Sequence, residues 1–156
     1  VKNLNLNKFY RNNKKKKYEL ITFWDVLEHV DNVDENFRIA KKMIKKKGYI
    51  FLITDIYDSL IGYLSEIIYK CSFGLIKYPI YKFFIKQNSV YFEKKILFDI
   101  CKKHKLNIIY NSAVDHPIER INLNFIEFLI LKILYFFGNI LKLNSQIFLV
   151  LQSSGK

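Results

Sequence analysis

The sequence predicts an α/β fold in which parallel strands alternate with helices. A strand, an acidic turn, a helix and a second strand follow one another between Tyr18 and Asp55. Such a run, joined by short loops, forms a parallel βαβ unit. Helical and strand-like segments then continue to the apolar run Ser145–Gln152. We therefore expect one sheet with helices packed against it, in a single domain.

The first strand follows a polar, basic segment. Residues 1–17 contain no apolar signal core and are expected to form a connecting loop. Tyr18–Trp24 is a run of apolar and β-prone residues that suits a buried strand. Because the chain starts at Val1 rather than at a methionine, we expect it to be a fragment whose true amino terminus lies upstream.

A capped helix is predicted between the two strands. Asp31 or Asn32 can cap it, and Asn32 with Glu35 has the spacing of a capping box. Lysines crowd its last turn, where the helix dipole favours cations. Gly48 stands where a C′ glycine would end the helix, and the second strand is expected over Tyr49–Thr54.

Each of these two strands is followed directly by an aspartate. Asp25 follows the first strand and Asp55 follows the second. Because parallel strands end at the same edge of a sheet, we expect the two carboxylates to form one acidic rim. In open α/β sheets, ligands bind at this edge.

The elements after Asp55 are less regular, and no repeat or linker divides them. Residues 1–156 are therefore expected to form a single partial domain, in which residues 1–17 are a loop or linker and residues 18–152 form its folded part. The predicted elements are a helix over Ser59–Lys70, an irregular aromatic stretch over Cys71–Asn88, a helix over Val90–His104 capped by Ser89, a short strand over Leu106–Tyr110, a loop over Asp115–Asn124, an apolar helix over Phe125–Leu141 and a closing strand over Ser145–Gln152.

Composition narrows the class of protein. With 51% apolar and 17% aromatic residues, the chain is not disordered. Its net charge of +12 suits an anionic partner such as nucleic acid, a membrane face or an acidic substrate. The lysines cluster at predicted loops and helix ends, which favours a coding bias without functional meaning. No nucleic-acid-binding motif is present, so nucleic acid is not expected as a partner.

Cellular location is addressed by the cysteines and by one apolar segment. Cys71 and Cys101 lack zinc-ligand spacing, and two isolated cysteines without a signal peptide indicate a reducing compartment, the cytoplasm. Ile121–Leu141 has about the roughly 20 residues needed to cross a bilayer. It contains Glu127 and Lys132, which are costly there, so a core helix is favoured. Peripheral membrane contact stays open.

Asp25, Glu28 and His29 are the tightest polar group in the sequence. Spacings of three and four place them on one side of a helical turn. Two carboxylates and an imidazole can bind a hard divalent cation or supply a base near neutral pH. Acids at a helix entrance also cap free N–H groups and offset the dipole, so a purely structural role is the alternative.

Three strings resemble class I S-adenosylmethionine-dependent methyltransferases. ITFWDVLEHVDNVDENFRIAKKMIKKKGYIFLIT is similar to the family's fourth strand, following helix and fifth strand. YFEKKILFDICKKHKLNIIYNSA is similar to its late helix and sixth strand, and SQIFLVLQ to its antiparallel seventh strand. The string WDVLEHV resembles the branch that includes ubiquinone-biosynthesis O-methyltransferases and many small-molecule or cell-surface-sugar methyltransferases. The resemblance implies a truncated Rossmann-like fold with strands four to seven, the last two an antiparallel pair.

The resemblance also implies a cofactor and site residues. The cofactor would be S-adenosylmethionine, bound in part by Phe23, Trp24 and Asp25 at the end of the fourth strand. In the ubiquinone-type branch, an acid followed by a Glu-His pair resembles a magnesium site, which implies Asp25, Glu28 and His29 as Mg²⁺ ligands. Without a metal, His29 is the candidate general base.

The implied activity is methyl transfer to a small-molecule, lipid or sugar acceptor. None of the five glycines lie close enough together to form a glycine-rich cofactor turn, so this fragment alone is expected to be inactive. The alternatives are an inactive partner-binding module and a basic membrane-surface protein that uses Phe125–Leu141. His116 is expected in a plain turn or near substrate, His104 facing solvent, and Tyr78–Phe84 in a lid, a membrane-facing patch or ordinary packing.

Overall fold

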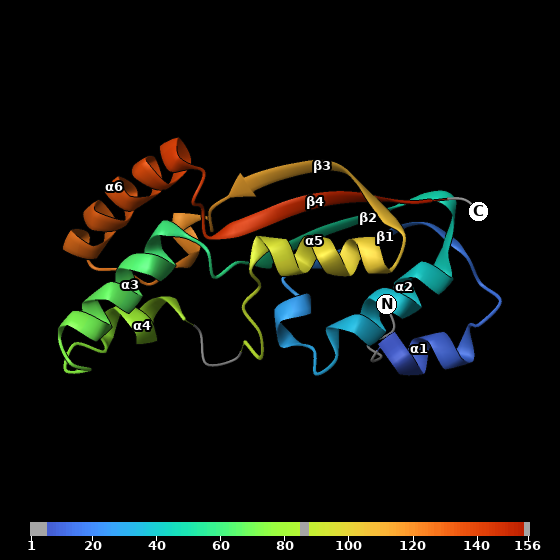
Figure 1. The fold of residues 1–156 in the computed structure, drawn as a ribbon, viewed down its shortest axis with the longest axis horizontal. Coiled ribbons are helices and arrows are strands. Elements are labelled where there is room, and N and C mark those ends of the chain that lie inside the picture. Colours follow the sequence, from blue (N-terminus) through green and yellow to red (C-terminus); the bar gives the residue numbers. More distant parts are fainter. Residues whose placement is uncertain (1–5, 85–87, 155–156) are drawn as a thin grey trace.

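The computed structural model describes residues 6–84 and 88–154. Its strands form one four-stranded sheet in the order β1-β2-β4-β3 (Figure 1). They span Tyr18–Trp24 (β1), Ile44–Asp55 (β2), Leu106–Val114 (β3) and Gln146–Ser153 (β4). β1 and β2 are parallel, and β4 lies antiparallel to both β2 and β3. The predicted α/β fold with an antiparallel last pair is confirmed.

The helices form two groups around the sheet. They span Leu6–Asn12 (α1), Val33–Met43 (α2), Leu60–Cys71 (α3), Tyr78–Phe83 (α4), Lys94–Lys103 (α5) and Phe125–Leu141 (α6), with short 3₁₀ turns at Leu27–His29 (η1) and Ile118–Arg120 (η2). α2 and α5 cover one face of the sheet, and α1 packs beside α2 (Figure 1). α3, α4 and α6 form a separate helical lobe beyond the carboxyl ends of β1 and β2 (Figure 1). Among the described residues, no helix has the length and apolar character needed to cross a membrane.

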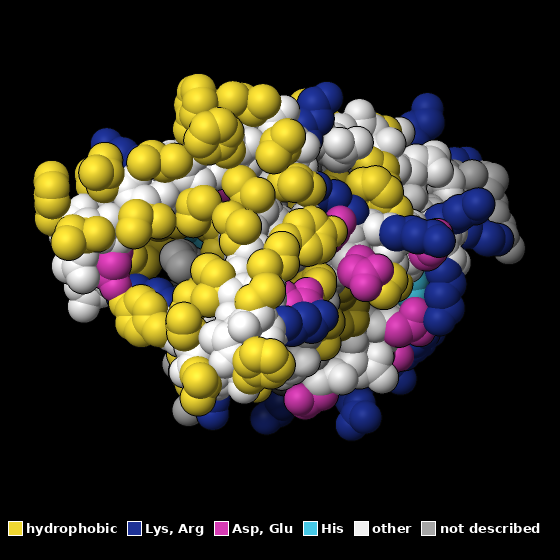
Figure 2. Space-filling model, turned by 60° about the vertical axis from the view of Figure 1, so that its left-hand side comes forward, with side chains coloured by type: hydrophobic (Ala, Val, Ile, Leu, Met, Phe, Trp, Pro, Cys, Tyr) yellow, Lys and Arg dark blue, Asp and Glu magenta, His cyan; other side chains and the backbone are white. Residues whose placement is uncertain are grey.

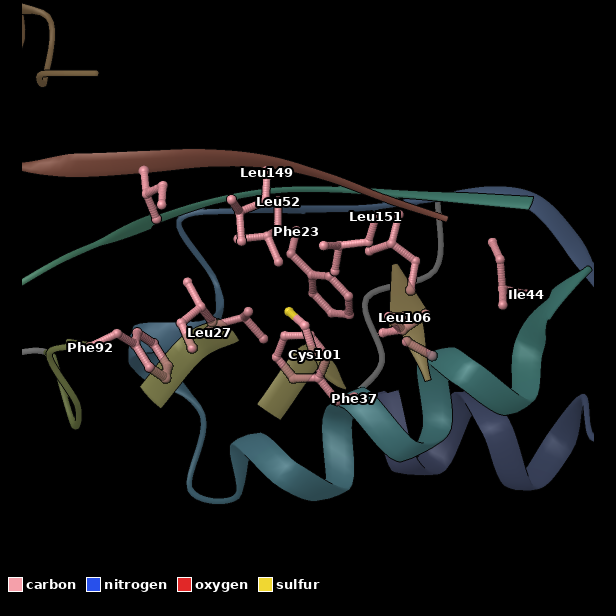
Figure 3. Packing of buried hydrophobic residues seen from close by; sticks show 14 of the residues in the cluster. Phe23, Leu27, Phe37, Ile44, Leu52, Phe92, Cys101, Leu106, Leu149 and Leu151 are labelled. Atoms are coloured by element: carbon pink, nitrogen blue, oxygen red, sulfur yellow. The ribbon is translucent and has the colours of Figure 1, made fainter. Parts of the chain in front are cut away.

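The main core lies between the sheet and the α2–α5 layer (Figure 3). Alternate residues of β2 and β4 point into it, because successive strand side chains face opposite sides of a sheet. Phe37 from α2 and Leu97 from α5 complete it and are fully buried. The opposite face of the sheet carries an aromatic group in which Phe148 stacks on Trp24 at 6.1 Å between ring centroids.

Several element boundaries differ from the prediction. α1 lies inside the expected loop 1–17. α2 ends at Met43, so the prediction that Gly48 ends this helix was wrong. Instead, Lys47 adopts a positive φ of 62°, and β2 bulges between Ile44, which pairs with Tyr18, and Tyr49, which pairs with Leu20. A Cβ atom on Gly48 would lie 2.9 Å from the Glu19 carbonyl oxygen, so this position requires glycine for close approach.

Tertiary pairing explains the later differences. α5 begins at Lys94 after Glu93 rather than at the predicted Ser89 cap, because Phe92 forms a parallel bridge with Ile56. β3 continues to Val114 because it pairs with β4 along its whole length. The short α4 lies in the stretch that was expected to be irregular.

Other expectations were met. The Asn32 side chain accepts a hydrogen bond from the Glu35 N–H at 2.9 Å, and α6 has the predicted bounds.

His104 was expected to face solvent, but its side chain is only 10% exposed, with Nε2 2.8 Å from Asp34. That prediction was wrong, because the end of α5 packs against α2.

Candidate functional site

An acidic rim lies at the carboxyl ends of β1 and β2. The side-chain amide of Gln146, at the start of β4, donates to Asp25 Oδ1 at 2.8 Å and to Asp55 Oδ1 at 3.0 Å. One amide thus joins two carboxylates that are thirty residues apart in sequence. The predicted rim is confirmed, and β4 supplies the bridging group.

The turn after β1 brings a third carboxylate to the rim. Asp25 has a positive φ of 48°, which turns the chain out of the strand and into η1. Glu28 is then only 1% exposed and accepts a hydrogen bond from the Thr54 hydroxyl at 2.8 Å. Burial, together with the nearby negative charges of Asp55 and Asp25, raises the pKa of Glu28 above its ordinary value, although the Thr54 bond opposes the shift.

The three carboxylates of Asp25, Glu28 and Asp55 form a compact group. One oxygen of each lies within 4.8 Å of the other two. His29 is not part of this group, as far as the described residues extend. It is exposed on η1 and borders a separate hollow beside α1 and α2. The helical spacing used in the prediction does not apply, because η1 begins only after the left-handed turn at Asp25.

His116 is the histidine that joins the rim. Its Nε2 lies 2.8 Å from Asp55 Oδ1, and the Asn88 side-chain amide donates to Asp55 Oδ2 at 2.9 Å. Burial alone would lower the pKa of His116, but the bond to Asp55 and the carboxylate charges outweigh it and raise this pKa. Burial would raise the pKa of Asp55, and the His116, Gln146 and Asn88 contacts outweigh it and lower this pKa.

A cavity of about 340 Å³ opens beside His116, between the rim and the helical lobe. Asp55 and His116 form its polar end. Its apolar wall comes from Ile56, Ile61, Phe84, Tyr91, Ile121 and Tyr135, and Lys82 and Asn122 lie at the lobe side. His116 was expected in a plain turn or near substrate. Its contact with Asp55 was not predicted, because the two residues are 61 positions apart in the sequence.

The predicted cofactor residues lie in three environments. Phe23 is 5% exposed and packs in the core, with its ring centroid 6.5 Å from that of Phe37. Trp24 is 56% exposed on the sheet face that the described helices leave open. Asp25 belongs to the rim. Only Trp24 and Asp25 therefore present side chains to a ligand at this edge, and their role stays a prediction.

Comparison with known protein families identifies the family of this sequence. A family model described as "Methyltransferase domain" matches residues 3–82, more than half of the 156 residues. The sequence matches no curated protein.

Solved structures share the fold at low identity. A SAM-dependent methyltransferase from Archaeoglobus fulgidus aligns with a TM-score of 0.60 and 13% identity over 97% of this chain and 66% of its own. A SAM-dependent methyltransferase from Thermotoga maritima aligns with a TM-score of 0.54 and 13% identity over 90% of this chain and 58% of its own.

The chain therefore spans about two thirds or less of the length of these structures. The family match begins before β1 and ends in α4. The chain belongs to the methyltransferase domain family.

Proposed function

We propose that this chain forms the carboxyl-terminal half of a methyltransferase domain that transfers a methyl group from S-adenosylmethionine to a small-molecule, lipid or sugar acceptor. The family match supports the reaction class. The observation that carries the site is the Asp55–His116 pair at the polar end of the cavity beside the rim. We place the reaction in the cytoplasm, with peripheral contact to the membrane.

The cofactor supplies a methyl group that is already activated on a sulfonium. The protein must hold the acceptor in line with it and remove the acceptor proton. We assign the cavity to the acceptor, because its walls are mostly apolar and only a few polar groups, Asp55 and His116 among them, line it. Trp24 and Asp25 are assigned to the cofactor side of the rim, together with the backbone of Phe23.

We assign His116 as the general base. With Nε2–H donating to Asp55, the neutral ring presents the Nδ1 lone pair as a proton acceptor. When the acceptor oxygen bonds to the methyl carbon and the carbon–sulfur bond breaks, the hydroxyl proton passes to Nδ1. The raised pKa of His116 strengthens it as a base. His29, the base predicted from sequence, is the competing assignment.

The predicted Mg²⁺ set of Asp25, Glu28 and His29 does not fit the arrangement of these side chains. His29 lies outside the carboxylate group, and the Gln146 amide already bridges Asp25 and Asp55. Thermal unfolding with millimolar Mg²⁺ tests this conclusion. Binding of Mg²⁺ to the folded protein would raise the melting temperature, and we expect no rise.

Two histidine variants separate the candidate bases. In the polypeptide that carries both halves of the domain, transfer from radiolabelled S-adenosylmethionine is measured with phenolic, fatty-acid and sugar acceptors. We expect His116→Gln to lower kcat at least about 10²-fold and His29→Gln to change it little. The reverse result assigns the base to His29. Equal activity of both variants and the parent protein contradicts both assignments.

A partner-binding module without activity is the second candidate. It is favoured by the lack of a glycine-rich turn in these residues. Binding of S-adenosylmethionine to the polypeptide with both halves discriminates the two: an active transferase binds the cofactor, and an inactive module does not.

A further inference from the structure

The helical lobe exposes a broad apolar surface that the methyl-transfer proposal does not use. Figure 2 shows hydrophobic side chains covering most of this end of the molecule. We propose that the lobe docks onto a lipid bilayer that contains anionic lipids. This inference names the surface and the lipid class for the membrane contact proposed above, and it does not depend on methyl transfer.

The apolar stripe runs along α6. Its exposed large residues, each about half or more accessible, are Phe125, Ile126, Leu129, Ile130, Ile133, Phe136, Phe137, Ile140 and Leu141. At about 100° per residue these positions share one arc of about 160°. The buried residues of α6, Leu131 and Gly138, lie on the other side. A helix of this kind lies parallel to a membrane surface with its apolar arc inserted.

Residues outside α6 extend this surface. Phe73 and Leu75, between α3 and α4, are 95% and 85% exposed, which is extreme for such large side chains. Tyr78 of α4 donates a hydrogen bond to Glu127 in the first turn of α6. α4 and the start of α6 therefore lie side by side, and the two apolar regions belong to one lobe.

The charges of the lobe favour an anionic bilayer as the occupant. Within α3, α4 and α6, both carboxylates among the described residues are bound by cations: Glu66 pairs with Lys70, and Glu127 lies 3.6 Å from Lys82. Lys132 stands at the edge of the α6 stripe, with Nζ 4.5 Å from the Phe128 ring centroid. Lysines with apolar stems at the rim of an inserted surface reach the lipid headgroups.

Exposed tyrosines also lie on the lobe. Tyr63, Tyr69, Tyr78 and Tyr81 are all exposed on α3 and α4. Aromatic rings with one polar end prefer the boundary between headgroups and acyl chains. The lobe thus exposes apolar, tyrosine and lysine side chains together, the three kinds of residue that contact a bilayer surface.

Sedimentation with vesicles tests the proposal on the full chain. We expect binding to vesicles of equal parts phosphatidylcholine and phosphatidylglycerol, and weaker binding to pure phosphatidylcholine or at high salt. Phe125→Ser/Ile126→Ser is expected to lower the partition coefficient at least about tenfold, since two large side chains leave the bilayer. The control Ile96→Ser/Ile109→Ser changes two large side chains that are about half exposed outside the lobe, and it is expected to bind normally.

A fluorescence experiment locates the inserted face. Trp24 is the only tryptophan and is the last residue of β1, outside the helices α3, α4 and α6. In Trp24→Phe/Phe136→Trp, brominated lipids are expected to quench the fluorescence, whereas Trp24 in the parent protein is quenched little.

Three results overturn the proposal. One is the absence of binding to the mixed vesicles. Another is equal binding of the Phe125→Ser/Ile126→Ser variant and its control. The third is that the parent protein is a dimer in light scattering, does not bind vesicles, and becomes a monomer when it carries Phe125→Ser/Ile126→Ser. This result would assign the α6 stripe to contact with a second copy of the chain.

Discussion

His116 and Asp55 form an ion pair whose stability depends on pH. The raised pKa of His116 adds stability that is fully present below its unfolded value of about 6.5 and lost as pH rises through the folded value. The lowered pKa of Asp55 adds stability that is present above its unfolded value of about 3.9 and lost as pH falls through the folded value. Burial raises the pKa of Glu28, so its ionisation costs more in the folded state than in the unfolded state. The free energy of unfolding therefore also falls as pH rises through the range in which Glu28 ionises.

The first prediction concerns His116→Gln. The amide keeps a donor for Asp55 but carries no charge, so the free energy of unfolding should fall by about 1–2 kcal/mol at pH 5.5 and change less at pH 8.5. Urea unfolding at the two pH values measures the difference, with His29→Gln as the control. An equal loss at both pH values would show that the ion pair contributes no pH dependence.

The second prediction compares two helical glycines. A Cβ atom on Gly62 would lie 2.4 Å from the Tyr57 carbonyl oxygen, whereas on Gly138 the nearest atom is the Leu143 carbonyl oxygen at 3.2 Å. Gly62→Ala should therefore destabilise the protein by about 1–3 kcal/mol. Gly138→Ala should be nearly neutral, because gained helix propensity of about 1 kcal/mol offsets mild crowding. Thermal unfolding ranks the two, and the opposite order would refute the close approach at Gly62.

At the scale of elements, α6 is held to the rest of the chain by few contacts. It starts with a capping box between Asn124 and Glu127, which stabilises its first turn. Leu131 and Gly138 are its only buried residues, and Lys142 ends it with a left-handed φ of 57°. An apolar helix with so little burial is defined by its caps and by Leu131 rather than by a core on all sides.

The third prediction follows from this attachment. Leu131→Ala should lower the free energy of unfolding by about 2–5 kcal/mol, because it removes the one large side chain that α6 buries completely. Leu129 lies on the exposed side of the same helix, and its side chain is 52% exposed. Leu129→Ala should therefore lower the free energy of unfolding by less than about 0.5 kcal/mol. Hydrogen exchange of α6 amides reports the local effect, and similar protection in both variants would contradict it.

At the scale of the whole molecule, the helices of the described part cover only one face of the sheet (Figure 1). Trp24, Tyr49 and Tyr110 remain exposed on the other face, and β1 is an edge strand. Such a surface favours self-association.

The fourth prediction concerns cofactor affinity. No two of the five glycines are close enough to form a phosphate- or cofactor-cradling turn, and the rim supplies only part of a pocket. Calorimetry of this chain with S-adenosylmethionine should therefore show no binding at micromolar concentration. Micromolar affinity would show that the chain holds a complete cofactor site.

How far the sequence predicts this protein depends on the range of the interaction. Local patterns are sufficient for β1, for the Asn32 cap and for α6, because strand alternation, capping and helical period act within a few residues. The boundary at Gly48 was misjudged because pairing with β1 draws Ile44 into the sheet and overrides the helix-ending preference of glycine. Parallel pairing of β1 and β2 was predictable, and with it the meeting of Asp25 and Asp55.

Residues that are close together in the chain are sufficient to predict the βαβ unit, its two terminal aspartates and the family resemblance. The folded arrangement was needed to show that Gln146 joins the aspartates and that His116 rather than His29 meets them. These contacts connect residues 61 to 121 positions apart. They arise from sheet pairing and helix packing, which no local pattern encodes.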